Sequence, residues 1–162
     1  MTTRDTQAAV LSLLDRLIDL DPDSQREPLS SPWDEMREFR LALCRDLGAL
    51  LNTRRAEEDF HPGYEEATNS LLTFGITDFT SYDLNSGLQQ ERVRRSIERA
   101  VRQFEPRLAS VTVSIEEPDP LRPVLRFQIA AMLRISPAAE PVVFDVTLQR
   151  ESRRIGVSGV AL

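Results

Sequence analysis

The sequence predicts an α+β domain in which N-terminal helices precede a three- to four-stranded, mainly antiparallel sheet. Two observations support this fold class. Apolar residues recur at helical spacing before residue 105, whereas after residue 110 they alternate with polar residues, as in strands with one solvent-facing side. Helices followed by a meander of strands are typical of an α+β domain. The 162 residues, 41% of them hydrophobic, suffice for one domain with a buried core.

We divide the chain into an N-terminal helical arm with its linker, residues 1–32, and an α+β domain, residues 33–162. The arm is predicted because five apolar residues share one helical face: Val10, Leu11, Leu14, Leu17 and Ile18. Residues 21–32 contain three prolines, three serines and several charges, which is typical of a linker. Docking of the arm on its own domain and docking on a partner both remain open.

The second helix is predicted to begin at Pro32, with Ser31 as its N-cap, and to end near Asn52. Leucines recur along it at helical spacing, together with a methionine and a phenylalanine. A shorter apolar stretch, residues 67–76, is interrupted at Gly75, where we expect a left-handed turn.

The third helix, residues 88–104, is strongly amphipathic. Its apolar residues fall within roughly a third of the helix circumference: Val93, Ile97, Ala100, Val101 and Phe104. The opposite face bears an arginine stripe, which consists of Arg92, Arg95, Arg99 and Arg102. This stripe is either the solvated back of a core helix or a basic surface that meets an acidic partner.

Alternating apolar residues then predict strands over residues 111–115, 125–133 and 142–148, and residues 155–160 form a candidate fourth strand. Between the helix and the first strand lies Glu105-Pro106-Arg107. Pro106 disfavours helix at Glu105 and forces a change of direction, which places one carboxylate and one guanidinium at a corner of the domain. The pair is either an internal lock of the junction or a fork presented to another protein.

The charged residues are unevenly distributed. All 20 basic residues are arginine, and they face 26 acidic residues, for a net charge of −6. Residues 1–87 contain 8 arginines and 17 acids, net −9, whereas residues 88–162 contain 12 arginines and 9 acids, net +3. This split indicates different faces or partners for the two halves.

Several functions are excluded by what the sequence lacks. One cysteine, Cys44, and one histidine, His61, allow neither an internal disulfide nor a thiolate or imidazole metal cluster. We find no catalytic set, glycine-rich phosphate loop or nucleic-acid reader motif, so we expect no enzyme activity, cofactor, metal or nucleic acid. The longest stretch without a charged residue, residues 67–77, has 11 residues, too few to span a membrane. Residues 1–9 lack a secretory signal pattern, so a cytoplasmic location is expected.

Four stretches of the sequence resemble the TssE family, the baseplate wedge subunits of bacterial type VI secretion systems, which is related to a small wedge protein of contractile phage tails. They are Ser12–Leu17, Asp46–Arg55, Ser70–Asp78 and Phe104–Leu108. The sequence departs from the family around Gly75. Members often have Asn and an aromatic residue before this glycine and Pro two residues after it, whereas Thr73, Phe74 and Thr77 stand at these places here.

The resemblance implies a structural role. A TssE-like protein joins TssF, TssG and TssK in the wedge, at the cytoplasmic face of the inner membrane. It is also implied to offer the first template for the sheath subunits TssB and TssC. The family motif matched by Glu105, Pro106 and Arg107 is implied to hold the wedge together. A baseplate wedge protein of a phage-derived tail, a peptidoglycan hydrolase and an adaptor for another partner are the alternatives.

Features of the residues agree with this role. A late strand with an unpaired edge can accept a partner strand through backbone hydrogen bonds. A rigid Glu/Arg corner can make charge-assisted hydrogen bonds across an interface. The candidate partner-binding residues are therefore the corner, the arginine stripe and the apolar residues of the third strand: Glu105, Pro106, Arg107, Arg92, Arg95, Arg99, Arg102, Phe144, Val146 and Leu148.

Overall fold

The computed structural model describes Leu17 and residues 32–55, 64–116, 124–135, 138–149 and 151–160. The predicted arm, its linker, the Ser31 cap and His61 therefore lie outside the described residues, apart from Leu17 and Pro32.

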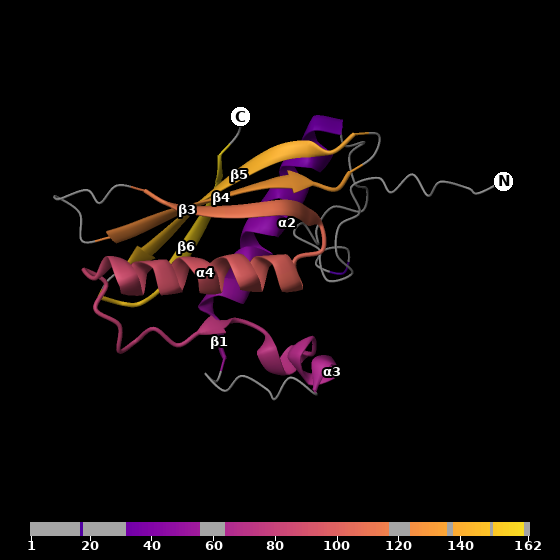
Figure 1. The fold of residues 1–162 in the computed structure, drawn as a ribbon. Helices are drawn as coiled ribbons and strands as arrows, with labels where there is room; N and C mark the ends of the chain where they lie inside the picture. Colours follow the sequence, from indigo (N-terminus) through magenta and orange to yellow (C-terminus); the bar gives the residue numbers. More distant parts are fainter. Residues whose placement is uncertain are drawn as a thin grey trace.

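Along the chain the helices, with two two-residue strands between them, come before the four strands of the main sheet (Figure 1). They are α2 (Pro32–Asn52), β1 (Arg54–Arg55), α3 (Glu65–Thr68), the 3₁₀ helix η1 (Leu71–Thr73), β2 (Ile76–Thr77), α4 (Gly87–Phe104), β3 (Leu108–Ile115), β4 (Val124–Leu133), β5 (Glu140–Gln149) and β6 (Ile155–Val160). The predicted start at Pro32 and end near Asn52 are confirmed for α2.

The main sheet is an antiparallel meander with the strand order β3-β4-β5-β6. This arrangement confirms the predicted α+β class, and Ile155–Val160 is confirmed as the fourth strand. A separate parallel pair, β1 with β2, joins Arg54 to Ile76 and Arg55 to Thr77. The sequence did not predict this pair, because two-residue strands are too short to show a periodicity.

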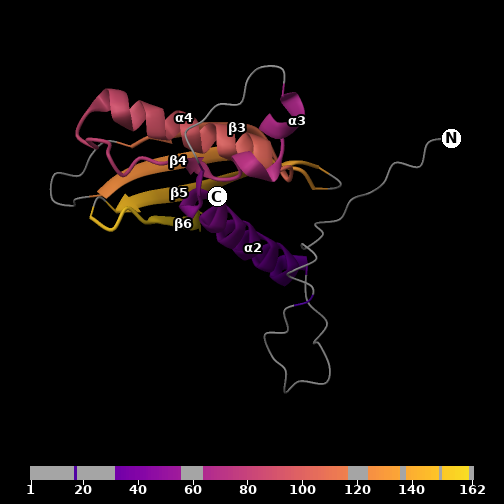
Figure 2. The same ribbon diagram turned by 90° about the horizontal axis from the view of Figure 1, so that it is seen from below.

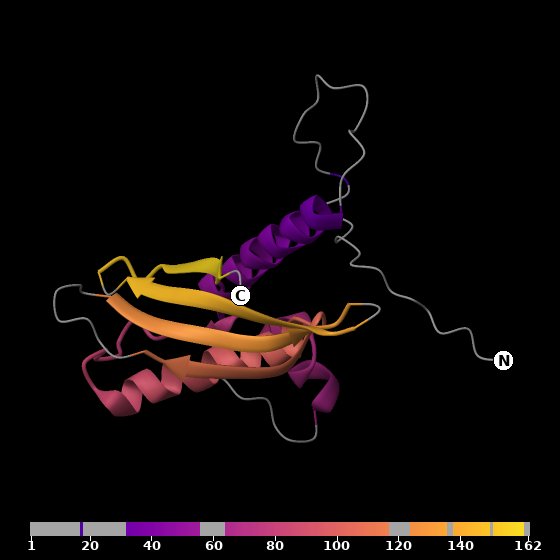
Figure 3. The same ribbon diagram turned by 90° about the horizontal axis from the view of Figure 1, so that it is seen from above.

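Both long helices cover one face of the sheet, as the views from below and above show (Figures 2 and 3). The core lies between these two layers. It is filled by Leu43 and Leu47 of α2, Ile97 of α4, and Phe127 and Phe144 of the sheet, each no more than 2% exposed. Alternate residues of β4 and β5 are less buried, which confirms the predicted apolar and polar sides of these strands.

The prediction that Phe144, Val146 and Leu148 meet a partner strand is wrong. Their strand, β5, is paired with β4 on one side and with β6 on the other, so it has no free edge. The three side chains are at most 1% exposed and belong to the core. The alternation of apolar and polar residues shows which side of a strand is buried, but not whether the strand lies at the edge of the sheet. The two edge strands of this sheet are β3 and β6.

Gly75 confirms the predicted left-handed turn, because its φ angle is +104°. A Cβ atom at this position would lie 2.4 Å from the carbonyl oxygen of Thr53, at the junction between α2 and β1. Glycine is therefore required both by the backbone conformation and by the space. No described helix combines the length and the hydrophobicity that crossing a membrane requires.

Candidate partner interface

The Glu105-Pro106-Arg107 corner lies where the chain leaves α4 and enters β3. The backbone N–H of Glu105 donates to the carbonyl of Val101 at 3.0 Å and completes the last turn of the helix. The N–H of Leu108 then donates to the carbonyl of Glu105 at 3.1 Å, which closes the turn around Pro106. Pro106 itself is exposed. The predicted change of direction therefore occurs here, with its backbone fixed on both sides.

The carboxylate of Glu105 is buried and bound within the chain. Glu105 is 4% exposed, and both of its carboxylate oxygens accept hydrogen bonds from Arg107. The Nε and Nη2 atoms of Arg107 lie 2.7 and 2.5 Å from Oε1 and Oε2, and the Arg107 backbone N–H adds a third bond at 3.1 Å. Of the two interpretations of the corner, the internal lock therefore describes Glu105.

Arg107 also joins the corner to helix α2. Its Nη2 atom lies 2.6 Å from Oδ2 of Asp46, and its guanidinium carbon lies 5.7 Å from the centre of the Phe39 ring. The hydrogen bonds to Glu105, and then those to Asp46, hold the pKa of Arg107 above its ordinary value despite partial burial. Its Nη1 atom is buried and has no hydrogen-bond partner among the described residues.

The four residues of the arginine stripe are all exposed, so the stripe lies on the outer face of α4 as predicted: Arg92, Arg95, Arg99 and Arg102. Carboxylates on the same helix neutralise part of its charge. Arg95 pairs with Glu91 at 2.8 Å, and Arg102 pairs with Glu98 at 2.6 Å. These are i, i+4 pairs of the kind that modestly stabilise a helix.

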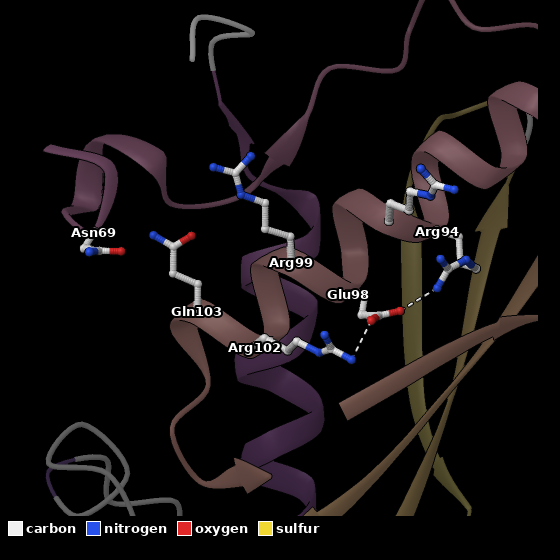
Figure 4. A pocket seen from close by; sticks show the side chains of 7 residues that line it. Asn69, Arg94, Glu98, Arg99, Arg102 and Gln103 are labelled. Carbon is white, nitrogen blue, oxygen red and sulfur yellow. Dashed lines mark hydrogen bonds and ion pairs between the residues drawn. The ribbon is translucent and has the colours of Figure 1, made fainter. Parts of the chain in front are cut away.

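Three residues of the stripe line a hollow of about 460 Å³ on this face (Figure 4). The lining residues are Asn69, Arg94, Arg95, Glu98, Arg99, Arg102 and Gln103. Gln103 donates from its Nε2 atom to the carbonyl of Thr68 at 2.7 Å and to Thr73 Oγ1 at 3.0 Å, and so fixes α3 and η1 at the rim. Three of the four guanidinium groups that line the hollow, those of Arg94, Arg95 and Arg102, are already paired with Glu91 or Glu98, so most of its positive charge is neutralised within the helix.

The sequence gives no signal for Arg94 of α4, although this arginine binds two carboxylates and a backbone carbonyl. Its side chain is 20% exposed and binds Glu91, Glu98 and the carbonyl of Val113. Its position between the apolar face and the stripe gave no signal of these contacts. Within the described part of the chain, no group of three histidine, cysteine, aspartate or glutamate residues is placed to hold a metal ion.

The comparisons with known proteins place these features in a family. The family model described as baseplate wedge protein gp25 matches residues 37–138, which is more than half of the chain. The match extends from α2 through β4 and includes the corner and the arginine stripe. A comparison with curated proteins finds no match. The extent of the family match shows that this chain belongs to the gp25 family of baseplate wedge proteins.

Proposed function

We propose that this protein is a non-enzymatic subunit of a type VI secretion baseplate, in which it joins the wedge and anchors the contractile sheath. Family membership gives the structural role in a baseplate wedge. The four stretches that resemble TssE support the secretion system as its setting. The partners in this proposal are TssF, TssG and TssK in the wedge and TssB and TssC in the sheath, and the site of assembly is the cytoplasmic face of the inner membrane.

The fixed geometry of the corner supports the wedge interface most directly. Pro106 is exposed on a turn whose backbone is fixed by hydrogen bonds at Glu105 and Leu108. Arg107 contacts Glu105 and Asp46 and keeps 22% of its side chain exposed. We therefore assign Arg107 a positioning role, in which it holds the corner in the shape that a wedge partner meets. A rigid surface loses little conformational entropy on binding.

The edge of β6 supports the sheath contact. Within the described residues β6 pairs with β5 alone, and Gly156, Ser158 and Gly159 are exposed along it. The side chain of Asn52 occupies the outward N–H and carbonyl of Ile155 at 3.0 and 2.8 Å. A strand added by a sheath subunit would therefore pair from Val157 onward.

Co-expression with TssF, TssG and TssK tests the wedge assignment. The purified complex is compared for the unaltered chain, Arg107→Ala and the control Arg126→Ala, which changes an arginine of β4. We expect Arg107→Ala to stay folded by circular dichroism but to yield less complex, because without the bonds from Arg107 to Glu105 and Asp46 the corner no longer keeps the shape that a partner meets. Equal recovery of the complex with Arg107→Ala and Arg126→Ala contradicts the interface role of the corner.

A wedge subunit of a phage-derived contractile tail is the second candidate, because the matching family is that of a phage-type baseplate wedge protein. Neighbouring genes separate the two: genes for TssF, TssG and TssK support secretion, whereas phage capsid and tail genes support a prophage. The hydrolase alternative gains no support from Glu105, since both of its carboxylate oxygens are bound by Arg107. Clearing of cell-wall substrate by the pure protein, lost in Glu105→Gln, would establish that alternative.

A further inference from the structure

The free edge of β3 is bound by arginine side chains from α4. In the part of the chain that the structure describes, β3 pairs only with β4, so its opposite edge faces away from the sheet. The Nε and Nη2 atoms of Arg102 donate to the carbonyl of Val111 at 3.0 and 2.7 Å. The Nη1 atom of Arg94 donates to the carbonyl of Val113 at 3.0 Å. Two successive outward carbonyls of the edge strand are therefore occupied.

Glu98 links the two arginines. Its Oε2 atom lies 2.5 Å from Nη1 of Arg94, and its Oε1 atom lies 2.6 Å from Nη2 of Arg102 (Figure 4). The side chains of Arg94 and Glu98 are 20% and 17% exposed, so solvent screens their charges only partly. Glu91 holds Arg94 from the other side, with 2.7 Å between Oε2 and Nε.

We infer that the bridge formed by Arg94, Glu98 and Arg102, here called the edge bridge, closes the β3 edge to strand addition. An added strand would have to donate its N–H groups to the carbonyls of Val111 and Val113, which already accept from guanidinium groups. Displacing these groups breaks charge-assisted hydrogen bonds and leaves Glu98 without its partners. Exposed edge strands are sites of uncontrolled pairing, and charged side chains are a common protection against it.

The two edges of the sheet therefore differ. At β6 the amide of Asn52 binds the backbone of Ile155, and the thiol of Cys44 lies close to Gly159. A thiol is a weak acceptor and is displaced more readily than a guanidinium held by a carboxylate. The sheet is consequently extendable at β6 and closed at β3. Closure at β3 is a property of the chain alone, and only its consequence for a sheath strand rests on the proposed function.

The purified full chain provides the test, with a second copy of itself as the incoming strand. In a Cys44→Ser background, Thr112→Cys places a reporter thiol on the exposed side of β3. The edge bridge is opened by Arg94→Ala with Arg102→Ala. The matched control is Arg92→Ala with Arg95→Ala, which removes the same charge from the same helix and leaves the bonds to Val111 and Val113 in place.

Sedimentation at increasing concentration should show an association constant for the opened variant that is roughly tenfold or more above that of the control. Mild oxidation should then link its copies through Thr112→Cys. Ser158→Cys on β6 should cross-link equally in both variants. If the arginine-to-alanine pair prevents folding, Arg94→Met with Arg102→Met removes the same guanidinium groups from the carbonyls of Val111 and Val113 and keeps most of the side-chain volume. A folded variant that stays monomeric, or that dimerises without the Thr112→Cys link, overturns the inference.

Discussion

The Nη2 atom of Arg107 lies 2.6 Å from Oδ2 of Asp46, a residue 61 positions earlier in the sequence. One guanidinium thereby joins the corner between α4 and β3 to the middle of α2. The same atom lies 2.5 Å from Oε2 of the buried Glu105. Arg107 is therefore the shared partner of two carboxylates from different parts of the fold.

Removal of this shared partner should destabilise the domain without unfolding it. We expect Arg107→Ala to lower the free energy of unfolding by roughly 1.5–3 kcal/mol, because Glu105 loses its cationic partner in a buried position. Asp46→Ala should lower the free energy of unfolding by less, since Arg107 keeps its hydrogen bonds to Glu105. Chemical denaturation of both single variants and the double variant measures the coupling. If the losses in unfolding free energy of the two single variants simply add in the double variant, the Arg107–Asp46 ion pair contributes nothing to stability.

The turn at Gly75 gives a second prediction. Gly75→Ala should lower the free energy of unfolding by at least roughly 1–3 kcal/mol, because a Cβ atom is strained at positive φ and would meet the carbonyl of Thr53. Gly48→Ala is the control: this glycine lies in α2 with no atom within 4 Å of the added Cβ. The control should stabilise the helix by about 0.5–1 kcal/mol. Thermal unfolding should show a lower midpoint temperature for Gly75→Ala and a higher one for Gly48→Ala. Equal shifts of the midpoint in the two variants would contradict the prediction.

The helices and strands could be predicted because their signal is local. The apolar period of α4 and the alternation in β4 and β5 depend only on which side of each element is buried. The pairing of β5 on both sides could not be predicted in this way, since alternation reveals a face and not an edge. Phe144, Val146 and Leu148 were therefore placed on a partner surface although they lie in the core.

The candidate site could be located from the sequence but not interpreted. Pro106 made the corner visible, yet the choice between an internal lock and an exposed fork depended on Asp46, which only the fold brings to Arg107. Likewise, the arginine stripe was visible as a helical face. The bonds from Arg94 and Arg102 to the β3 carbonyls are tertiary contacts with no sequence pattern.

Asn52 should anchor β6 to the end of α2. Its Nδ2 atom donates to the carbonyl of Ile155 at 2.8 Å and its Oδ1 atom accepts from the Ile155 N–H at 3.0 Å. Asn52→Asp keeps the acceptor but replaces the donor by an oxygen that faces the Ile155 carbonyl. We expect the free energy of unfolding to fall by roughly 1–3 kcal/mol and the β6 amides to exchange hydrogen faster. Unchanged exchange at Ile155 would contradict the anchoring role.

Glu91 should remain ionised far into the acid range. Hydrogen bonds from Arg94, and then from Arg95, lower its pKa from the ordinary 4.5 to about 2. Since the folded pKa lies below the unfolded one, the stability that Glu91 contributes is fully present above 4.5 and is lost as the pH falls toward about 2. The difference in unfolding free energy between the unaltered chain and Glu91→Gln should therefore shrink within this window. Titration of the Glu91 carboxyl carbon by NMR measures the pKa directly, and Arg94→Ala should raise it more than Arg95→Ala does. A larger effect of Arg95→Ala would mean that the exposed arginine, and not the one bound to β3, holds the Glu91 charge.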